Sequence, residues 1–159
     1  MEEAVSVYTS RVAEKLRRER LAATVLTVYL TTNEFKEGPQ YSNAITMRLP
    51  VATDTTSDII QCALQGIRAI YRDGYRYKKA GVMFTGLVPA SQTQADLFDY
   101  HDRGKSKRLM SALNAINDRW GAGTLQYASS GIAKTWQTQF HRRSPAYTTD
   151  WNALPVVTA

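Results

Sequence analysis

The chain has 159 residues, 43% of them hydrophobic and 21% charged, which is the balance of one folded domain, or of one domain with a short appended module. No apolar run approaches the ~18 residues that cross a bilayer, the start is acidic, and one cysteine cannot build a disulfide framework, so a cytoplasmic protein without membrane contact is expected. Its 20 lysines and arginines exceed its 14 acidic residues by 6, which favours a polyanionic partner without identifying one.

The first predicted element is a helix near the N-terminus. Its apolar residues recur at spacings of three, four and four, and therefore share one face: Val5, Tyr8, Val12 and Leu16. The opposite face is basic and carries Arg11, Lys15 and Arg18. These cations either contact phosphate groups or simply face solvent, and the pattern alone leaves both possibilities open.

Two strands follow the helix and are predicted at residues 24–31 and 44–49. In both, apolar side chains alternate with polar ones, so that one face is apolar and the other is rich in hydroxyl groups. No helix separates the two segments, which predicts an antiparallel pair. Pro50 is expected to end the second strand, because proline cannot donate a backbone hydrogen bond.

A second helix and a third strand complete the predicted sheet domain. Thr55 is a candidate N-cap, apolar residues then recur with helical period, and Gly74 is placed to end the helix in a left-handed turn. The third strand is predicted at residues 79–88. This order predicts an α+β fold, in which two helices cover one face of a three-stranded antiparallel sheet and leave the other face open.

The C-terminal third has a different character. Residues 1–91 form the predicted sheet domain, 92–106 a polar linker, and 107–159 a small helical and irregular module. Within this module a helix is predicted at 107–120 and a short strand at 124–128. The aromatic residues of the module are expected to be buried: Trp136, Phe140, Tyr147 and Trp151.

No catalytic, metal or cofactor site is predicted. Two-metal polynucleotide synthesis needs carboxylates that converge from strands, and the predicted strands contain no internal aspartate or glutamate. His101 and His141 are isolated, and Cys62 on the apolar side of the second helix is expected to be a core residue. The chain is therefore expected not to be an enzyme by itself.

The linker contains a short motif whose pattern is Gln, any residue, Asp or Ser, Leu, Phe. Its defined positions are Gln94, Asp96, Leu97 and Phe98, and the motif looks like the peptide that binds the bacterial sliding clamp. The two adjacent apolar side chains would fill a hydrophobic pocket of the partner, while the glutamine amide forms hydrogen bonds at its rim. The alternative is that Leu97 and Phe98 fold back onto their own domain.

A basic and aromatic cluster spans residues 71–79, between the second helix and the third strand. It interleaves tyrosines with Arg76, Lys78 and Lys79, so that cations would reach phosphates while rings support them or stack. A solvated turn, with its rings packed on the edge of the sheet, explains the same pattern equally well.

Together these segments resemble the little-finger domain of Y-family DNA polymerases, specifically the UmuC-like (ImpB/MucB/SamB) branch. Residues 11–17 and 75–83 carry the resemblance in the domain, and the peptide at 94–98 follows it. Residues 116–124 and 142–151 resemble the C-terminal extension of that branch. The resemblance covers nearly the whole chain.

The resemblance implies translesion synthesis under the SOS response, in a complex with UmuD-like partners and tethered to the sliding clamp. In the family, the catalytic palm and its metal-binding carboxylates lie upstream. The chain is therefore expected to be a fragment that grips DNA and tethers the clamp. The alternative is a non-catalytic interaction protein that occupies the clamp or the UmuD-like partner.

The family's little finger also begins with a strand before the first helix. Without that strand we expect marginal stability or strand-swapped association.

The predicted open face of the sheet agrees with a DNA role. It carries hydroxyl groups and a cation: Thr27, Tyr29, Thr46 and Arg48. Such a face suits phosphate and groove contacts without base discrimination, as expected for sequence-nonspecific binding. An ordinary solvated sheet face would carry similar residues.

Overall fold

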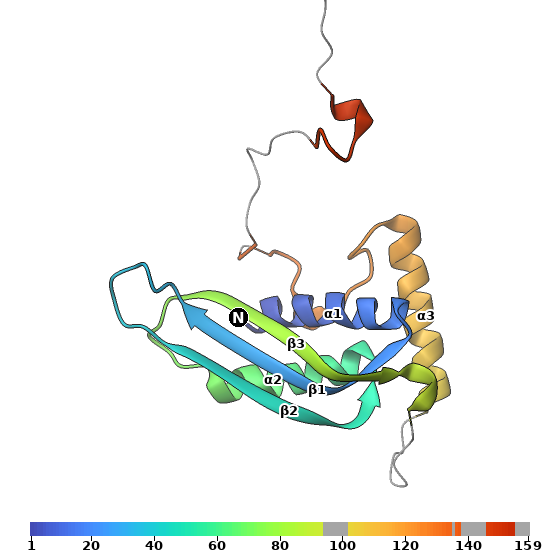
Figure 1. The fold of residues 1–159 in the computed structure, drawn as a ribbon, viewed down its shortest axis with the longest axis horizontal. Coiled ribbons are helices and arrows are strands. Elements are labelled where there is room, and N and C mark those ends of the chain that lie inside the picture. Colours follow the sequence, from blue (N-terminus) through green and yellow to red (C-terminus); the bar gives the residue numbers. More distant parts are fainter. Residues whose placement is uncertain (94–101, 135, 138–145, 155–159) are drawn as a thin grey trace, which may run out of the picture.

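The computed structural model describes residues 1–93, 102–134, 136–137 and 146–154. Its main elements appear in Figure 1 in the order α1 (Glu2–Arg18), β1 (Leu21–Thr32), β2 (Ser42–Thr53), α2 (Thr56–Ile70), β3 (Tyr77–Pro89) and α3 (Arg103–Trp120). Three short 3-10 turns are also present: η1 (Ala90–Gln92), η2 (Ala128–Ser130) and η3 (Trp151–Ala153).

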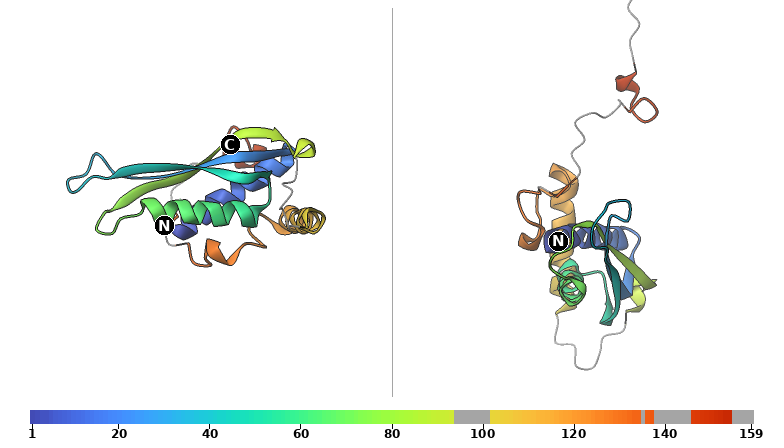
Figure 2. Two further views of the ribbon diagram at one scale, coloured as in Figure 1. Left: turned by 90° about the horizontal axis from the view of Figure 1, so that it is seen from below. Right: turned by 90° about the vertical axis from the view of Figure 1, so that its left-hand side faces the viewer.

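The three strands form one antiparallel sheet in the order β2-β1-β3. Figure 2 shows α1 and α2 on the same face of this sheet. The predicted α+β arrangement and the antiparallel pairing of the first two strands are therefore confirmed. The third strand pairs directly with β1 from Leu21 to Thr32, so β3 has a hydrogen-bonding neighbour within this chain and forms one edge of the sheet.

The hydrophobic core lies between the sheet and the two helices. Alternate side chains of β1 point into it because side chains of a strand alternate between the two faces of the sheet: Leu26, Val28 and Leu30. The helices contribute residues at helical spacing: Val5, Ala13, Leu16, Ile59, Ala63 and Ile67. Each large side chain buried in this way contributes about 1.5–3 kcal/mol relative to remaining exposed.

The second strand is longer than the sequence indicated. Pro50 does not end it, because β2 continues to Thr53. The proline is tolerated for two reasons: β2 is an edge strand, and the β1–β2 register shifts between Ala23 and Val25, so that no partner on β1 needs an N–H from position 50. The prediction that proline would stop the strand was wrong because the position of a strand within its sheet is not a local property.

The ends of the helices also differ from the predictions. The second helix ends at Ile70, and Gly74, at φ +85°, lies four residues later in the turn that leads to β3. The third helix begins at Arg103 rather than 107, because the carboxylate of Asp102 accepts a hydrogen bond from the backbone N–H of Lys105. The strand predicted at 124–128 does not form, and the chain there enters η2.

The aromatic residues of the C-terminal part are not all buried. Trp136 packs edge-on against Tyr8 of α1, with ring centroids 5.7 Å apart. Tyr147 and Trp151 are 48% and 87% exposed, so the expected burial does not occur at these two positions. Phe140 lies outside the described residues.

Among the described helices, none is both long enough and apolar enough to cross a membrane.

Candidate nucleic-acid interface

The face of the sheet that points away from the helices is open (Figure 2). Its side chains come from the positions of the strands that alternate with the core positions: Thr27, Tyr29, Thr31, Thr46, Arg48, Lys79, Met83 and Thr85. The three strands contain Arg48, Lys78 and Lys79 but no aspartate or glutamate. The open face therefore presents positive charge that no acidic residue of the strands offsets.

Two threonines at the centre of this face hold one another in place. Thr27 and Thr46 are direct partners across β1 and β2, and their hydroxyl oxygens are 2.8 Å apart. Each hydroxyl group has one hydrogen to donate, and this contact uses only one of the two. The remaining hydrogen is available to an acceptor outside the sheet, such as a phosphate oxygen.

The ring of Tyr29, on β1, lies over the backbone of the neighbouring strand β3. It faces Gly81 of β3 in the register, and a Cβ atom built on Gly81 would overlap the tyrosine ring. The absence of a side chain at Gly81 therefore lets the ring lie against the backbone of β3. The residue remains 41% exposed, and its hydroxyl has no hydrogen-bond partner within the described ranges.

Arg48 and Lys79 stand at opposite ends of the face. Arg48 is paired with Val25 and Lys79 with Thr31, six residues apart along β1. At about 3.3 Å per residue, the two positions are separated by about 20 Å along the strands. This is the axial length of about six base pairs of duplex DNA. Neither side chain makes a hydrogen bond or ion pair with any residue that the structure describes.

The basic residues predicted on the first helix do not belong to this surface. Arg11, Lys15 and Arg18 lie on α1, in the helical layer on the other side of the sheet. The guanidinium of Arg18 is also engaged, since it contacts Glu14 at 2.7 Å and Asp118 at 2.8 Å. The expected DNA-binding residues therefore form two separate groups rather than one surface.

The basic and aromatic cluster lies at the end of the sheet where β3 begins. Its rings pack on one another: the centroid of Tyr75 is 5.0 Å from that of Tyr41 and 6.3 Å from that of Tyr77. The hydroxyl of Tyr41 also donates a hydrogen bond to the carbonyl of Ile70 at 2.8 Å. These contacts favour the structural explanation for the rings, although Arg76, Lys78 and Lys79 remain next to them as candidate phosphate contacts.

The clamp-binding motif lies outside the described residues, with all four of its defined positions: Gln94, Asp96, Leu97 and Phe98. His101 and His141 lie outside them as well. Within the part of the chain that is described, no group of three or more His, Cys, Asp or Glu side chains is arranged to hold a metal ion. Cys62 is half-buried against the core, and this burial raises the pKa of its thiol.

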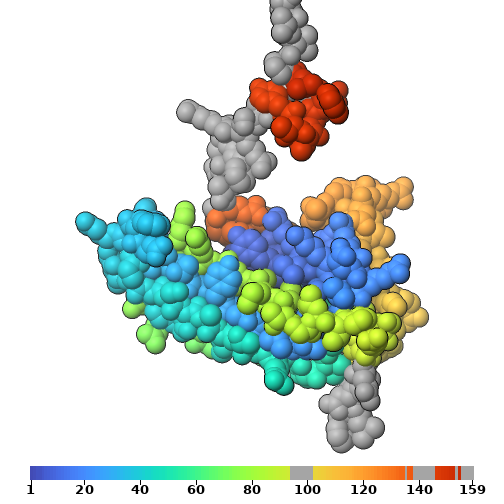
Figure 3. All heavy atoms as spheres, in the orientation of Figure 1, coloured from blue at the N-terminus to red at the C-terminus, as the bar shows by residue number. Residues whose placement is uncertain are grey.

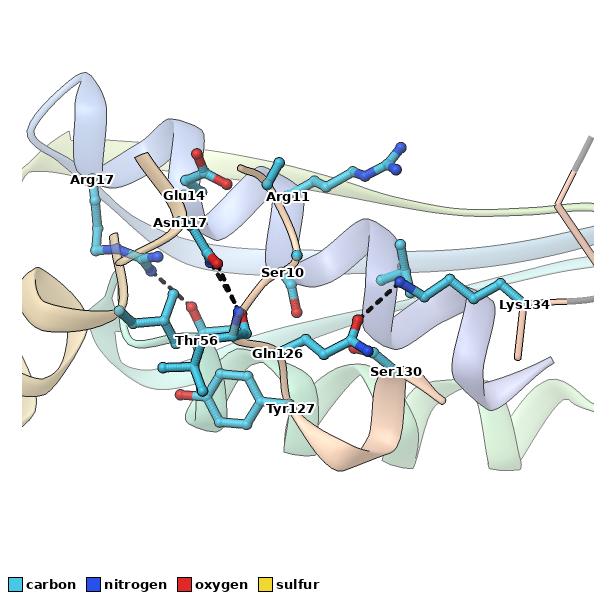
Figure 4. Close-up of a pocket in the computed structure, with 15 residues that line it drawn as sticks. Ser10, Arg11, Glu14, Arg17, Thr56, Asn117, Gln126, Tyr127, Ser130 and Lys134 are labelled. Carbon is cyan, nitrogen blue, oxygen red and sulfur yellow. Dashed lines mark hydrogen bonds between the residues drawn. The ribbon is translucent and has the colours of Figure 1, made fainter. Parts of the chain in front are cut away.

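One feature that the sequence analysis missed is the junction between α1 and the C-terminal part, shown in Figure 4 and, in space-filling form, in Figure 3. The guanidinium of Arg17 donates hydrogen bonds to the Asp54 carbonyl at 2.9 Å, the Thr56 hydroxyl at 2.7 Å and the Asn114 side-chain oxygen at 2.8 Å. This one side chain therefore links α1, the start of α2, and α3. A sequence pattern could have revealed it, because Arg17 follows Ala13 by one helical turn and so falls beside the buried stripe.

The guanidinium group of Arg17 is partly buried. Burial lowers the pKa of its guanidinium, while the nearby carboxylates of Asp54 and Glu14 oppose that shift. The group stays protonated, since the ordinary pKa of arginine is far above neutral. A small cavity of about 110 Å³ lies beside the junction. Gln126 and Lys134 also line it, and the Lys134 ammonium donates a hydrogen bond of 2.9 Å to the Gln126 side-chain oxygen (Figure 4).

Each of the two parts of the chain matches a known protein family profile. Residues 1–97 match the profile of the impB/mucB/samB family C-terminal domain. The chain belongs to the impB/mucB/samB family. Residues 107–157 match a second profile, which is described as a domain of unknown function, DUF4113. The junction at Arg17 therefore joins the impB/mucB/samB domain to this second domain.

Several curated impB/mucB/samB proteins are similar to the chain over almost its whole length. Protein ImpB of Salmonella typhimurium is 39% identical over 158 residues, which cover 98% of this chain and 37% of ImpB. Protein MucB of Escherichia coli is 38% identical over 160 residues, or 99% of this chain and 37% of MucB. Protein UmuC of Salmonella typhimurium strain LT2 is 36% identical over 156 residues. The chain thus spans less than two fifths of the length of these relatives.

Proposed function

We propose that this chain is the part of a UmuC-like translesion DNA polymerase that grips DNA and tethers the enzyme to the sliding clamp, without the catalytic palm. The proposal rests on membership of the impB/mucB/samB family. The observation that carries the DNA role is the open face of the sheet, where Arg48 and Lys79 stand about 20 Å apart along the strands with no acidic residue on any strand.

The side chains of this face suit contacts with the DNA backbone, whose charge is the same whatever the base sequence. Guanidinium, ammonium and hydroxyl groups can contact phosphate oxygens, which are the same at every nucleotide. The face carries no asparagine or glutamine among the side chains named above, and these amides are the residues that read adenine edges. A grip that does not depend on the bases is what a polymerase needs next to a damaged base.

Binding of short duplexes of unrelated sequence, measured by fluorescence anisotropy over a range of salt concentrations, tests the DNA role. Lys79→Gln and Arg48→Gln should each reduce the slope of log affinity against log salt by about 0.9, the value for one phosphate contact. Lys15→Gln is the matched control, because this exposed lysine lies in the helical layer, and its slope should equal that of the wild type. Salt-independent binding, strong sequence preference, or an equal effect of Lys15→Gln would refute the proposed surface.

The clamp role depends on the sequence pattern at residues 94–98. Such peptides bind weakly alone, and gain effect when a second binding surface raises their effective concentration. Leu97→Ala with Phe98→Ala should abolish binding to a purified sliding clamp and leave duplex binding unchanged. Clamp binding that survives both substitutions would refute the role of the peptide.

The alternative function is a non-catalytic interaction protein, which occupies the clamp or a UmuD-like partner and does not use DNA. The same double substitution separates the two hypotheses in cells. If every cellular effect is lost while purified DNA binding persists, the interaction protein is the better description. If a cellular effect remains and depends on Lys79 and Arg48, the DNA-gripping role is supported.

A further inference from the structure

A groove of about 1040 Å³ lies at the end of the sheet where β2 finishes. Its walls come from segments that are far apart in the sequence: the turn between α1 and β1, the last residues of β2, the start of α2, η1, and the first two turns of α3. The domain matched by the impB/mucB/samB profile and the C-terminal part thus form the groove together, and neither encloses it alone.

Five basic residues line this groove: Arg17, Arg20, Arg48, Arg103 and Lys107. Arg20 comes from the turn between α1 and β1, Arg48 from β2, and Lys107 from α3. The side chains of Arg20, Arg48 and Lys107 have no hydrogen-bond or ion-pair partner in the described part of the chain. Of the two acidic residues in the lining, Asp54 lies next to the Arg17 guanidinium, which leaves Asp58 against three available cations.

The rest of the lining indicates the kind of ligand. Its floor on β2 is apolar and includes Leu49, Pro50 and Val51, while Gln61 and Gln65 of α2 offer amide groups. The lining contains no aromatic ring among the described residues, so the groove offers no platform on which bases could stack. Its volume is close to that of a large small-molecule site, which gives room for a few nucleotides of one strand but not for a duplex.

Arg48 connects the groove to the open face of the sheet. It lines the groove and also stands on that face, opposite Val25 of β1. A nucleic acid that lies along the sheet would therefore reach the groove without leaving positively charged surface. This continuity favours a nucleic acid, which is long enough to contact both the sheet and the groove, over a short acidic protein segment, which would occupy the groove alone.

We propose that this groove binds the sugar-phosphate backbone of a single DNA strand that extends beyond a duplex held on the sheet. The inference deepens the proposed function and takes its ligand from it. Arg20, Arg48 and Lys107 contact successive phosphates, and the C-terminal part takes part in DNA binding through α3.

The test compares a blunt duplex with the same duplex carrying a single-stranded overhang, both bound to the full chain. Lys107→Gln should weaken binding of the overhang substrate about fivefold at 0.1 M salt. One lost single-strand phosphate contact lowers the salt slope by about 0.7. Relative to a 1 M salt reference, the affinity at 0.1 M salt therefore falls by about 10 to the power 0.7, which is about fivefold. Binding of the blunt duplex should not change.

The matched control is Lys105→Gln. Lys105 is an exposed lysine on the same helix and carries the same charge, but it does not line the groove. It should leave both affinities unchanged. If both lysine variants weaken binding equally, or if neither has an effect, the groove is not a strand-binding site and the proposal is overturned.

Cys62 provides a second readout, because it lines the groove and is the single cysteine of the chain. Overhang DNA should slow its alkylation at alkaline pH, whereas blunt duplex should not. No slowing by overhang DNA, or equal slowing by a poly-aspartate peptide, would overturn the proposal, and the second result would assign the groove to an acidic protein segment.

The two proposals fail in different ways. If blunt duplex binds as expected and the overhang adds no affinity, only the groove proposal fails. If blunt duplex does not bind and the Lys107-dependent effect of the overhang persists, the proposed grip of duplex DNA fails and the groove proposal stands.

Discussion

Arg17 joins the two parts of the chain, because its side chain on α1 donates hydrogen bonds to the start of α2 and to α3. Replacing it with methionine keeps an apolar stem of similar length and removes three donated hydrogen bonds, to Asp54, Thr56 and Asn114. A hydrogen bond from a charged group contributes about 1.5–3 kcal/mol, but such values do not add, and the variant also avoids the cost of burying the guanidinium. We expect Arg17→Met to lower the free energy of unfolding by about 2–3 kcal/mol.

The loss of stability should be greatest at α3. Asp54 and Thr56 lie at the start of α2, within the sheet domain, whereas Asn114 is the acceptor on α3. A double-mutant cycle between Arg17→Met and Asn114→Ala should therefore give a coupling energy of about 1–2 kcal/mol, measured by urea unfolding. Amide hydrogen exchange should increase more in α3 than in β1, because the buried central strand keeps its own core contacts.

Arg18→Met is the matched control for this prediction. Arg18 follows Arg17 directly and also contacts α3, through Asp118, but its side chain is 60% exposed. Exposed ion pairs contribute at most about 1 kcal/mol, so this variant should cost less than Arg17→Met. A loss below about 1 kcal/mol for Arg17→Met, or a coupling energy within about 0.5 kcal/mol of zero, would refute the argument that Arg17 holds the junction together.

Three further predictions concern the sheet and the surface. Gly81→Ala should cost about 1–3 kcal/mol by thermal or urea unfolding because its Cβ overlaps the Tyr29 ring, and it should cost clearly less in a Tyr29→Ala background; equal costs in both backgrounds would contradict this contact. The hydrogen bond from Arg68 lowers the pKa of Glu2, so the unfolded chain binds more protons on the acidic side and the pair loses its stabilising effect as the pH falls through the lowered pKa. Glu2→Gln should therefore be less stable than the wild type at neutral pH and equally stable once the carboxyl group of the wild type is protonated, and a stability difference that does not change with pH would contradict this assignment. The outer edge of β3 (Tyr77–Pro89) has no strand partner in the described structure, so we expect marginal stability or strand-swapped association in analytical ultracentrifugation; a monodisperse monomer of high thermal stability would argue against it.

Several properties of this protein could be read from the sequence alone. The order of helices and strands, and the division of each into an apolar and a polar face, depend on periods of 3.6 and 2.0 residues along the chain. Leu26, Val28 and Leu30 are therefore core residues, and Thr27 and Tyr29 lie on the opposite face, as the alternation indicated. The family was likewise accessible, because it depends on the order of residues in long segments.

Only the tertiary structure decided which residues act together. Arg17 and Arg18 are neighbours in the sequence, yet one is partly buried between three helices and the other is exposed, because that difference depends on where α3 packs. Pro50 continues a strand because β2 lies at an edge. Arg48 lies on the opposite face of the sheet from α1, which carries Arg11 and Lys15, and it shares a groove with Lys107, 59 positions away in the chain. Periodicity gives the direction of a side chain from its own element, whereas a binding surface depends on the packing of elements distant in sequence.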